Sequence, residues 1–167
     1  MAILEQIFES TEIHPIDIVE TLAERHAWDF DRVTDDQIAM AIEGQWRTYS
    51  ITLAWSPYDE TLRLVCSFEM DPPVQKLGLL YETLNLANDE CWAGAFTLWK
   101  EHKLMAYRYG LVLAGGEVAG PQQLAQLVET AVMNSERFFP AFQLVCWGED
   151  QPHEAMRVAM DVAYGTA

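Results

Sequence analysis

The glycine-rich segment before residue 121 has the spacing of a phosphate-binding loop, which makes it the first candidate for chemistry. Gly115, Gly116 and Gly120 supply the glycines. Such a loop continues with a lysine and then a serine or threonine that holds magnesium, but Pro121 and Gln122 stand at those two positions. We therefore expect a connection from a strand to a helix whose first residue is Pro121.

The acidic run that contains Asp29 and Asp31 is the second candidate. With Val33 these residues form a D-x-D-x-V pattern, which carries the nucleophile and the acid of aspartyl-phosphate enzymes. The sequence has neither the apolar strand that precedes the pattern in those enzymes nor the Rossmann-like sheet that follows it. With Asp35 and Asp36, the region also lacks the central glycine and the final glutamate of a calcium loop. We expect a solvated acidic strand and turn.

The histidines and cysteines form no pattern that binds a metal or activates a nucleophile. The four histidines include no H-x-x-x-H pair and are scattered: His14, His26, His102 and His153. The three cysteines lack a C-x-x-C pair and occur in apolar segments: Cys66, Cys91 and Cys146. We expect buried free thiols in a reducing cytoplasm, and we predict no catalytic residue, no cofactor and no metal site.

The charge of the chain restricts its partners. The 167 residues include 10 Lys and Arg against 26 Asp and Glu, a net charge of -16. Nucleic acids and anionic membranes attract Lys and Arg, so neither is an expected partner. Hydrophobic residues make up 50% of the chain, which excludes a disordered acidic tail, and no apolar run is long enough to span a bilayer. The charge is uneven, because residues 1–43 contain eleven acidic and two basic side chains.

Hydrophobic periodicity predicts an α+β fold in one domain, residues 1–167. Helical periods occur at residues 15–26, at 77–92, from 121 to about 147, and in a last short segment. Strand periods occur at residues 28–32, 38–42, 49–55 and 62–68, and in a hairpin of 94–100 and 104–113. Pro140 should kink or split the third helix. Because short turns join the strands, we expect a two-layer sandwich of an antiparallel sheet and helices.

Three side chains are candidates for contact with a partner. Trp99 lies on the opposite face of its expected strand from Phe96 and Leu98. Met156 and Met160 form an apolar stripe on the last segment, which either docks on the domain or adapts to a partner.

Two stretches carry a resemblance to a known family. They are Leu84-Asn85-x-x-Asn88 with Trp92, Gly94, Phe96-x-Leu98-Trp99 and Tyr107-Arg108, and Glu136-Arg137-Phe138-Phe139-Pro140-Ala141-Phe142-Gln143. With His14-Pro15 before the first helix, the chain resembles the YbjN family, its alphaproteobacterial branch in particular, over residues 14–167. Residues 1–13, with a helix expected at 2–9, form an extra segment. The resemblance implies a fold similar to type III secretion chaperones and a role in bacterial sensory transduction, with no catalytic residues to transfer.

Three functions remain open at this stage. The first is a non-catalytic module that binds a protein or peptide, as a chaperone-like adaptor or a regulator, with a basic partner favoured by the acidic amino-terminal region. The second is an enzyme or a small-ligand protein that uses scattered residues such as Asp29, Asp31 and His102. The third is a homodimer whose apolar surfaces serve assembly.

Overall fold

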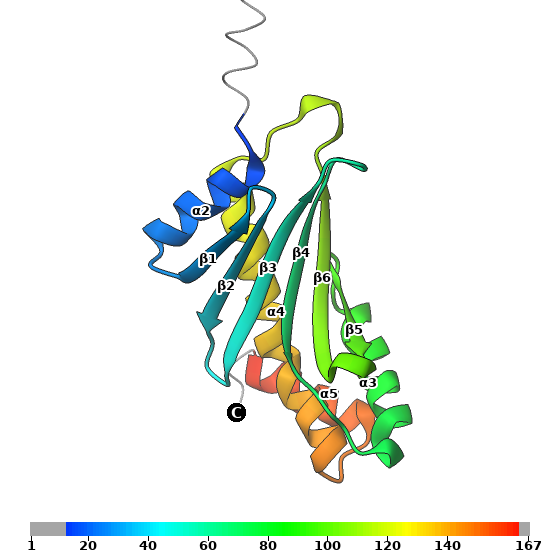
Figure 1. Ribbon diagram of the computed structural model, residues 1–167. Coiled ribbons are helices and arrows are strands. Elements are labelled where there is room, and N and C mark those ends of the chain that lie inside the picture. Colours follow the sequence, from blue (N-terminus) through cyan, green and yellow to red (C-terminus); the bar gives the residue numbers. More distant parts are fainter. Residues whose placement is uncertain (1–12, 164–167) are drawn as a thin grey trace, which may run out of the picture.

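An antiparallel sheet of six strands forms one layer of the molecule, and helices form the other (Figure 1). The computed structural model describes residues 13–163. The strands are β1 (Asp29–Thr34), β2 (Gln37–Glu43), β3 (Thr48–Ser56), β4 (Thr61–Glu69), β5 (Ala95–Trp99) and β6 (Leu104–Val112), in the spatial order β1-β2-β3-β4-β6-β5. The helices are α2 (Pro15–Arg25), α3 (Leu77–Asp89), α4 (Pro121–Trp147) and α5 (Pro152–Ala163). This arrangement confirms the expected α+β fold class.

The core lies between the sheet and the helices because the central strands carry their large apolar side chains mainly on one face. In β3 and β4, Ile51 is paired with Cys66 and Leu53 with Leu64, and all four side chains are fully buried or nearly so. The alternate residues point to the other side of the sheet, as the period of two predicts. Helix α4 runs behind the sheet along its length (Figure 1), and its buried stripe closes the core.

Helix α2 is fixed to β1 and the β1–β2 turn through its amino-terminal half. At its start the Nδ1 atom of His14 accepts a hydrogen bond from the Ile16 amide at 3.1 Å, and its Nε2 lies 2.8 Å from Oδ1 of Asp36 in the β1–β2 turn. Arg32 of β1 donates to the carboxylates of Asp17 at 3.0 Å and Glu20 at 2.7 Å. Carboxylates near a helix N-terminus and a capping side chain both stabilise the helix start.

One helix boundary differs from the sequence prediction. Helix α3 ends at Asp89, not near Trp92, because the amides of Glu90 and Cys91 turn back to bond the carbonyls of Ala87 and Asn88. Trp92 is 97% exposed in the following connection.

Helix α4 is continuous through Pro140, so of the two expected alternatives, a kink or a split, the split is wrong. Proline removes one helical hydrogen bond, but the neighbouring Phe138, Phe139, Ala141 and Phe142 are all buried, and their packing holds the segment helical.

The connection before α4 agrees with the sequence prediction. Gly115 and Gly116 have φ angles of 76° and 78°, which glycine adopts without strain, and Pro121 is the first residue of the helix. The expected helix at residues 2–9 lies outside the described residues. None of the described helices is both long enough and apolar enough to cross a bilayer.

Candidate functional site

The residues singled out for chemistry are not brought together. Asp29 and Asp31 lie exposed on β1, whereas His102 lies exposed in the β5–β6 hairpin, on the strand pair at the other end of the sheet. His26 stacks on Trp28 with ring centroids 4.6 Å apart. Within residues 13–163 no group of three or more acidic, histidine or cysteine side chains could hold a metal ion.

The three cysteines are free thiols. Cys66 and Cys146 are buried and Cys91 is half-buried, and burial raises the pKa of each thiol to about 11. The thiolate is the nucleophilic form, so these side chains are unreactive near neutral pH.

Alkaline pH is expected to destabilise the fold through these thiols. Their pKa rises from 9.0 to about 11 on folding, so the native state keeps protons that the unfolded chain releases. The associated stability is complete below pH 9 and is lost as the pH approaches 11. Urea midpoints measured between pH 7 and pH 10.5 should be constant up to about pH 8.5 and then fall. A midpoint that stays constant to pH 10.5 would contradict this assignment.

The predicted contact residues have different environments. Trp99 is half-buried, is paired with Leu104, and lines a hollow of about 430 Å³ with Lys100, Glu101 and His102.

Met156 is only 8% exposed and belongs to the core, and the Met160 sulfur lies 2.9 Å from Nη2 of Arg137. The apolar stripe of α5 therefore packs on α4, and Met156 is not available to a partner in this conformation.

The face of the sheet that points away from the helices is a broad surface of small side chains, here called the open sheet face. Its central residues are Ala39 and Ala41 of β2, Ser50, Thr52 and Ala54 of β3, and Val65 and Ser67 of β4. They are all half-buried or exposed. A depression of about 360 Å³ crosses this face between β1 and β3. The sequence indicates this surface, because the side chains at the outward positions of these strands are nearly all small.

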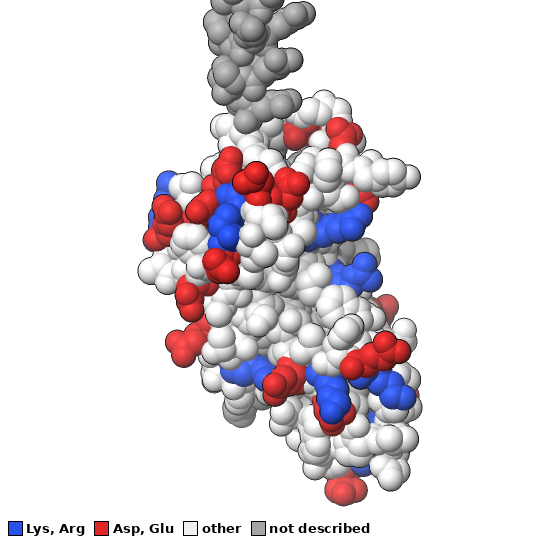
Figure 2. Space-filling model, in the orientation of Figure 1, with Lys and Arg blue, Asp and Glu red and all other residues white. Residues whose placement is uncertain are grey.

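Charges of opposite sign border the open sheet face. Asp29 and Asp31 project from β1, and Arg63 and Arg108 project from β4 and β6. Figure 2 shows uncharged surface between the acidic groups over α2 and β1 and the basic groups over β4 and β6. Arg63 is paired with Asp59 at 2.8 Å, whereas Asp29 and Asp31 form no ion pair with a described residue.

Asn88 closes the β5 edge of the sheet. Its Oδ1 accepts a hydrogen bond from the Phe96 amide at 2.6 Å, and its Nδ2 donates to the Phe96 carbonyl at 3.0 Å. The side-chain amide thus occupies the place of a neighbouring strand. An unprotected strand edge invites pairing with another chain, so Asn88 restricts such pairing on this side.

Asn88→Asp is expected to destabilise the protein by about 2 kcal/mol. The substitution removes the Nδ2 donor and turns a carboxylate oxygen toward the Phe96 carbonyl, which leaves that half-buried acceptor unpaired. Asn85→Asp, at an exposed position of the same helix, introduces the same charge and should change the free energy of unfolding by less than about 0.5 kcal/mol. Equal effects of the two substitutions in urea unfolding would contradict the role of Asn88.

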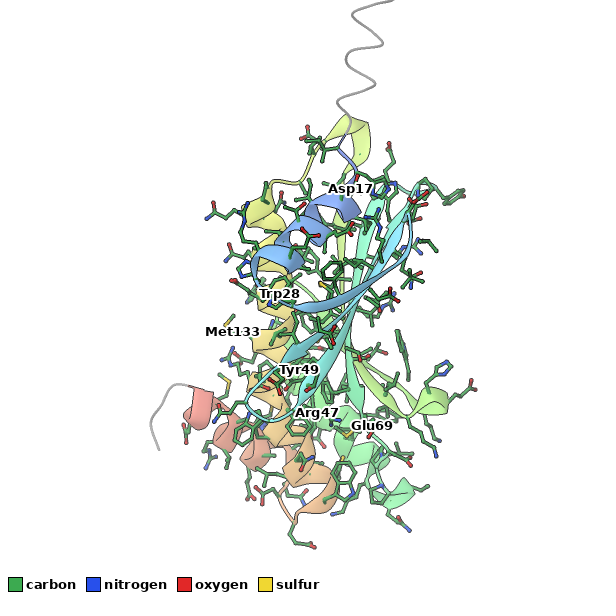
Figure 3. All side chains as sticks on the ribbon, turned by 60° about the vertical axis from the view of Figure 1, so that its left-hand side comes forward. Asp17, Trp28, Arg47, Tyr49, Glu69 and Met133 are labelled. Carbon is green, nitrogen blue, oxygen red and sulfur yellow. The ribbon has the colours of Figure 1, made fainter. Side chains whose placement is uncertain are left out.

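Glu136 of α4 holds the β2–β3 turn. Its carboxylate accepts hydrogen bonds from the amides of Gln45 at 3.0 Å and Trp46 at 3.3 Å, and from the Tyr49 hydroxyl at 2.5 Å. Burial, together with this carboxylate, raises the pKa of Tyr49. Figure 3 shows Tyr49 on the side of β3 that faces α4, and Arg47 beside the same turn.

The guanidinium of Arg47 extends this contact to the aromatic core. It lies 5.6 Å from the ring centre of Phe68 and 5.4 Å from that of Phe139. The stretches quoted for the family resemblance therefore contain residues that hold the fold together, such as Glu136 and Phe139.

Most of the chain matches the model of a known protein family. The YbjN family model, described as "Putative bacterial sensory transduction regulator", matches residues 15–144. The chain belongs to the YbjN family. The YbjN match includes all six strands and most of α4, and it ends before α5, which is shorter than the resemblance over 14–167 implied.

One solved structure supports the fold of this YbjN family member. The crystal structure of YbjN from E. coli, "a putative transcription regulator", is 10% identical with a TM-score of 0.50, over 90% of this chain and 91% of that chain. A chain of the HopA1–SchA chaperone-effector complex is 17% identical with a TM-score of 0.46, over 78% of this chain and 91% of that chain. No curated protein matches the sequence.

Proposed function

We propose that this YbjN family protein is a non-catalytic regulator that binds a polypeptide segment on the open sheet face. The observation that carries the proposal is the uncovered surface of small side chains across β2, β3 and β4. Such side chains let a strand or a helix of a partner approach the sheet backbone closely. The depression on this face is shallow and extended, which suits a polypeptide better than a small metabolite.

The charges around the open sheet face favour a basic partner segment over β1. Asp29 and Asp31 are exposed there and form no ion pair with a described residue. Complementary charges raise association rates and exclude partners of the same sign. At the other edge of the sheet, the Asn88 side chain already forms hydrogen bonds with the backbone amide and carbonyl of Phe96. A partner segment therefore reaches the open sheet face more easily from the β1 side.

Three further observations support this function. The family is described as "Putative bacterial sensory transduction regulator", and binding of a partner protein is one way in which such a regulator acts. The candidate residues for an enzyme, Asp29, Asp31 and His102, lie toward opposite edges of the sheet, where they cannot act on one substrate atom. The free thiols fit a protein that acts in the reducing cytoplasm.

Site-specific photo-crosslinking tests this function directly. A photoreactive phenylalanine analogue placed at Thr52 or Ser67, in the full chain and in cells that produce the protein naturally, should trap the same discrete partner. The analogue at Gln126, exposed on α4 in the helical layer, should trap none. Asp31→Lys should lower the yield several-fold, and Asp89→Lys, an equal charge change on α3, should leave it unchanged.

Three results would overturn the proposal. The first is equal trapping at Thr52 and Gln126. The second is a crosslink that joins only two copies of this chain, which would assign the face to a homodimer. The third is a metabolite that raises the melting temperature of the wild-type chain but not of Asp31→Asn, which would favour a small-ligand function.

A further inference from the structure

The sheet has a step where β6 continues beyond β5. Strand β5 begins at Ala95, opposite Arg108, whereas β6 runs on along β4 to Val112. In Figure 1, β5 accordingly lies beside only the lower part of β6. Within residues 13–163, no strand pairs with residues 109–112 on the side away from β4. This part of β6 is therefore an edge of the sheet.

The direction of the backbone groups in β6 follows first from its pairing with β5. Phe96 bonds the Asn88 side chain through its amide and its carbonyl, so these groups point away from β6. The alternate residues of β5, such as Ala95, must then turn their backbone groups toward β6. Their partners in β6 are the even-numbered residues, beginning with Arg108.

The pairing with β4 gives the same assignment. The Leu113 amide, just after β6, donates to the Glu60 carbonyl, just before β4, at 2.8 Å. Odd-numbered residues of β6 therefore bond β4, and even-numbered residues point to the other side. Gly110 and Val112 thus present their amide and carbonyl groups outward, where these have no partner in the described part of the chain. We call these outward groups of Gly110 and Val112 the free edge of β6.

The chain before β5 does not cover the free edge, because it approaches from the helix side at Gly94. A Cβ atom on Gly94 would lie 2.6 Å from the Arg108 carbonyl oxygen and 2.7 Å from Cζ of Tyr107. Tyr107 is buried on the helix side, where its hydroxyl accepts a hydrogen bond from Asn134 of α4 at 3.1 Å. Only glycine passes this close to both groups, so the entry to β5 runs beside Tyr107 and not along Gly110.

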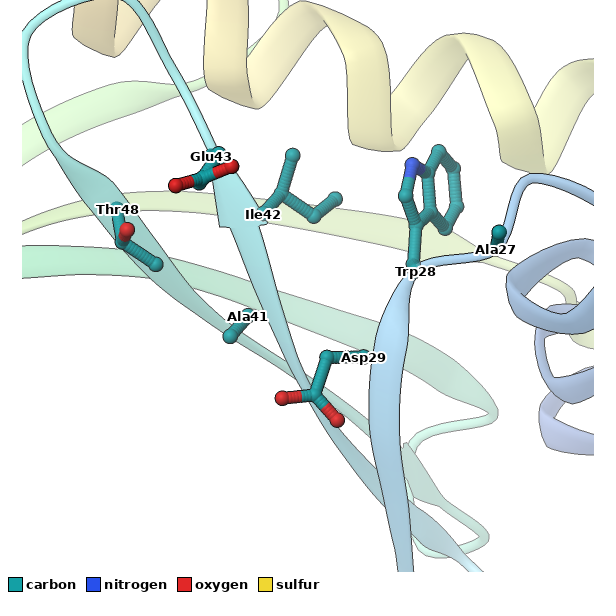
Figure 4. A pocket seen from close by; sticks show the side chains of 7 residues that line it. All are labelled: Ala27, Trp28, Asp29, Ala41, Ile42, Glu43 and Thr48. Carbon is teal, nitrogen blue, oxygen red and sulfur yellow. The ribbon is translucent and has the colours of Figure 1, made fainter.

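The edges formed by β5 and β1 are protected against pairing. The Asn88 amide closes the edge of β5. Strand β1 carries the charges of Asp29 and Asp31, and its register shifts near its carboxyl end. Figure 4 shows the start of β1, where the Asp29 and Glu43 carboxylates project on one side of the strands and Trp28 on the other. Charged side chains and irregular register are common means of preventing an edge from pairing with another chain.

The free edge of β6 lacks such protection and is flanked by apolar side chains. Val112 is 65% exposed on the open sheet face, and the exposed Gly110 adds no side chain beside it. Tyr109 and Leu111 are half-buried on the helix side. An added strand would cover these side chains and satisfy the backbone groups of Gly110 and Val112 at the same time.

The charge beside the free edge favours an acidic segment. Arg108 is exposed on the open sheet face and forms no ion pair with a described residue. It is the next residue after Gly110 on that face, because side chains on one face of a strand are two residues apart. A residue of an added strand opposite Gly110 would be the diagonal neighbour of Arg108, within reach of a long side chain. Glutamate at that place would pair with Arg108.

We infer that the free edge of β6 binds an extended acidic segment of a partner protein, which adds to the sheet as a strand antiparallel to β6. The backbone of the segment pairs with Gly110 and Val112, a glutamate opposite Gly110 pairs with Arg108, and two apolar residues cover Leu111 and Val112. This inference goes beyond the proposed function, because it concerns an edge of the sheet and an acidic segment, not the open sheet face and a basic one.

Titration of the full chain with a synthetic peptide tests the free edge. The probe is acetyl-Thr-Val-Val-Glu amide, whose glutamate is designed to lie opposite Gly110, and the readout is amide hydrogen exchange by NMR. In the free protein, the amides of Gly110 and Val112 should exchange rapidly and that of Leu111 slowly. At about 90% saturation, exchange at Gly110 and Val112 should slow about tenfold, because only the unbound tenth of the molecules exchanges.

Matched peptides separate backbone pairing from general attraction. N-methylation of the first valine removes an amide that faces β6 and should abolish binding. N-methylation of the second valine, whose amide points away from β6, should change the affinity less than about twofold.

Matched substitutions test the charge. Arg108→Gln should weaken binding of the peptide about threefold, which is the effect of one exposed ion pair. Arg25→Gln, at an exposed position of α2, makes the same change in net charge and should weaken binding less than about 1.5-fold.

Each of four results would overturn the inference: slow exchange of the Gly110 amide in the free protein, equal weakening by the two N-methylated peptides, equal weakening by Arg108→Gln and Arg25→Gln, or no binding at millimolar peptide. Crosslinking at Thr52 reports on the open sheet face, so failure at the free edge is distinguishable from failure of the proposed function.

Discussion

Phe138→Ala is expected to destabilise the protein by about 3–5 kcal/mol, the largest effect of any single substitution considered. Phe138 is fully buried on α4, where its ring lies 6.0 Å from that of Phe96 of β5 and 5.0 Å from the Arg137 guanidinium carbon. Alanine would remove the apolar contact and leave a cavity between α4 and the β5–β6 hairpin. Urea unfolding should show a much lower midpoint with an unchanged slope.

A control on the same helix isolates the cavity as the cause. Met133 is 62% exposed on the outer side of α4, so Met133→Ala should change stability by less than about 0.5 kcal/mol (Figure 3). A loss below about 1 kcal/mol for Phe138→Ala would mean that the aromatic contact does not contribute to the core.

Gly44→Ala is expected to destabilise the protein by about 3 kcal/mol because it displaces the Glu136 carboxylate. A Cβ atom at this position would approach Oε1 of Glu136 to 2.2 Å and Cε2 of Tyr49 to 2.6 Å. The carboxylate would have to leave the amides of the β2–β3 turn and the Tyr49 hydroxyl, and the hydroxyl would then be buried without its acceptor. Thermal or urea unfolding measures this loss of stability.

The same substitution at Gly78 provides the control. Gly78 lies in the first turn of α3 with nothing within 4 Å of its added Cβ, so Gly78→Ala should stabilise the protein by up to about 1 kcal/mol. In the Glu136→Ala background, Gly44→Ala should lower the free energy of unfolding clearly less than it does in the wild type. The added Cβ then clashes only with Tyr49, because the Glu136 carboxylate is absent. Full additivity of the two substitutions would show that Glu136 is not the group displaced.

The sequence was a good guide to the elements whose signals are local. The strands β3 and β4 follow the predicted alternation because each inward residue, from Tyr49 to Leu53 and from Leu62 to Phe68, must leave water. The start of α4 at Pro121 follows from the fixed φ of proline. The acidic segment at Asp29 and Asp31 is indeed an exposed strand.

The sequence was a poorer guide where distant contacts outweigh a local preference. Helix α3 ends before Trp92 because the Asn88 side chain forms hydrogen bonds with the Phe96 backbone. These bonds require the chain to turn back between Asn88 and Phe96. Helix α4 continues through Pro140 because buried neighbours on both sides pack against the sheet. For the stripe of Met156 the sequence left open docking on the domain or contact with a partner, and Met156 is buried because α5 packs on α3 and α4.

The amino-acid sequence by itself determined the types of the elements, the acidity, the absence of recognised catalytic motifs and the family. Periodicity along a chain records which residues of an element are apolar, and composition records charge. Only the tertiary structure decided which face of the sheet the helices leave open, and which side chain of α4 holds the β2–β3 turn. Those juxtapositions depend on strand register and on contacts such as that of Glu136 with Gln45, 91 residues apart, which no local pattern encodes.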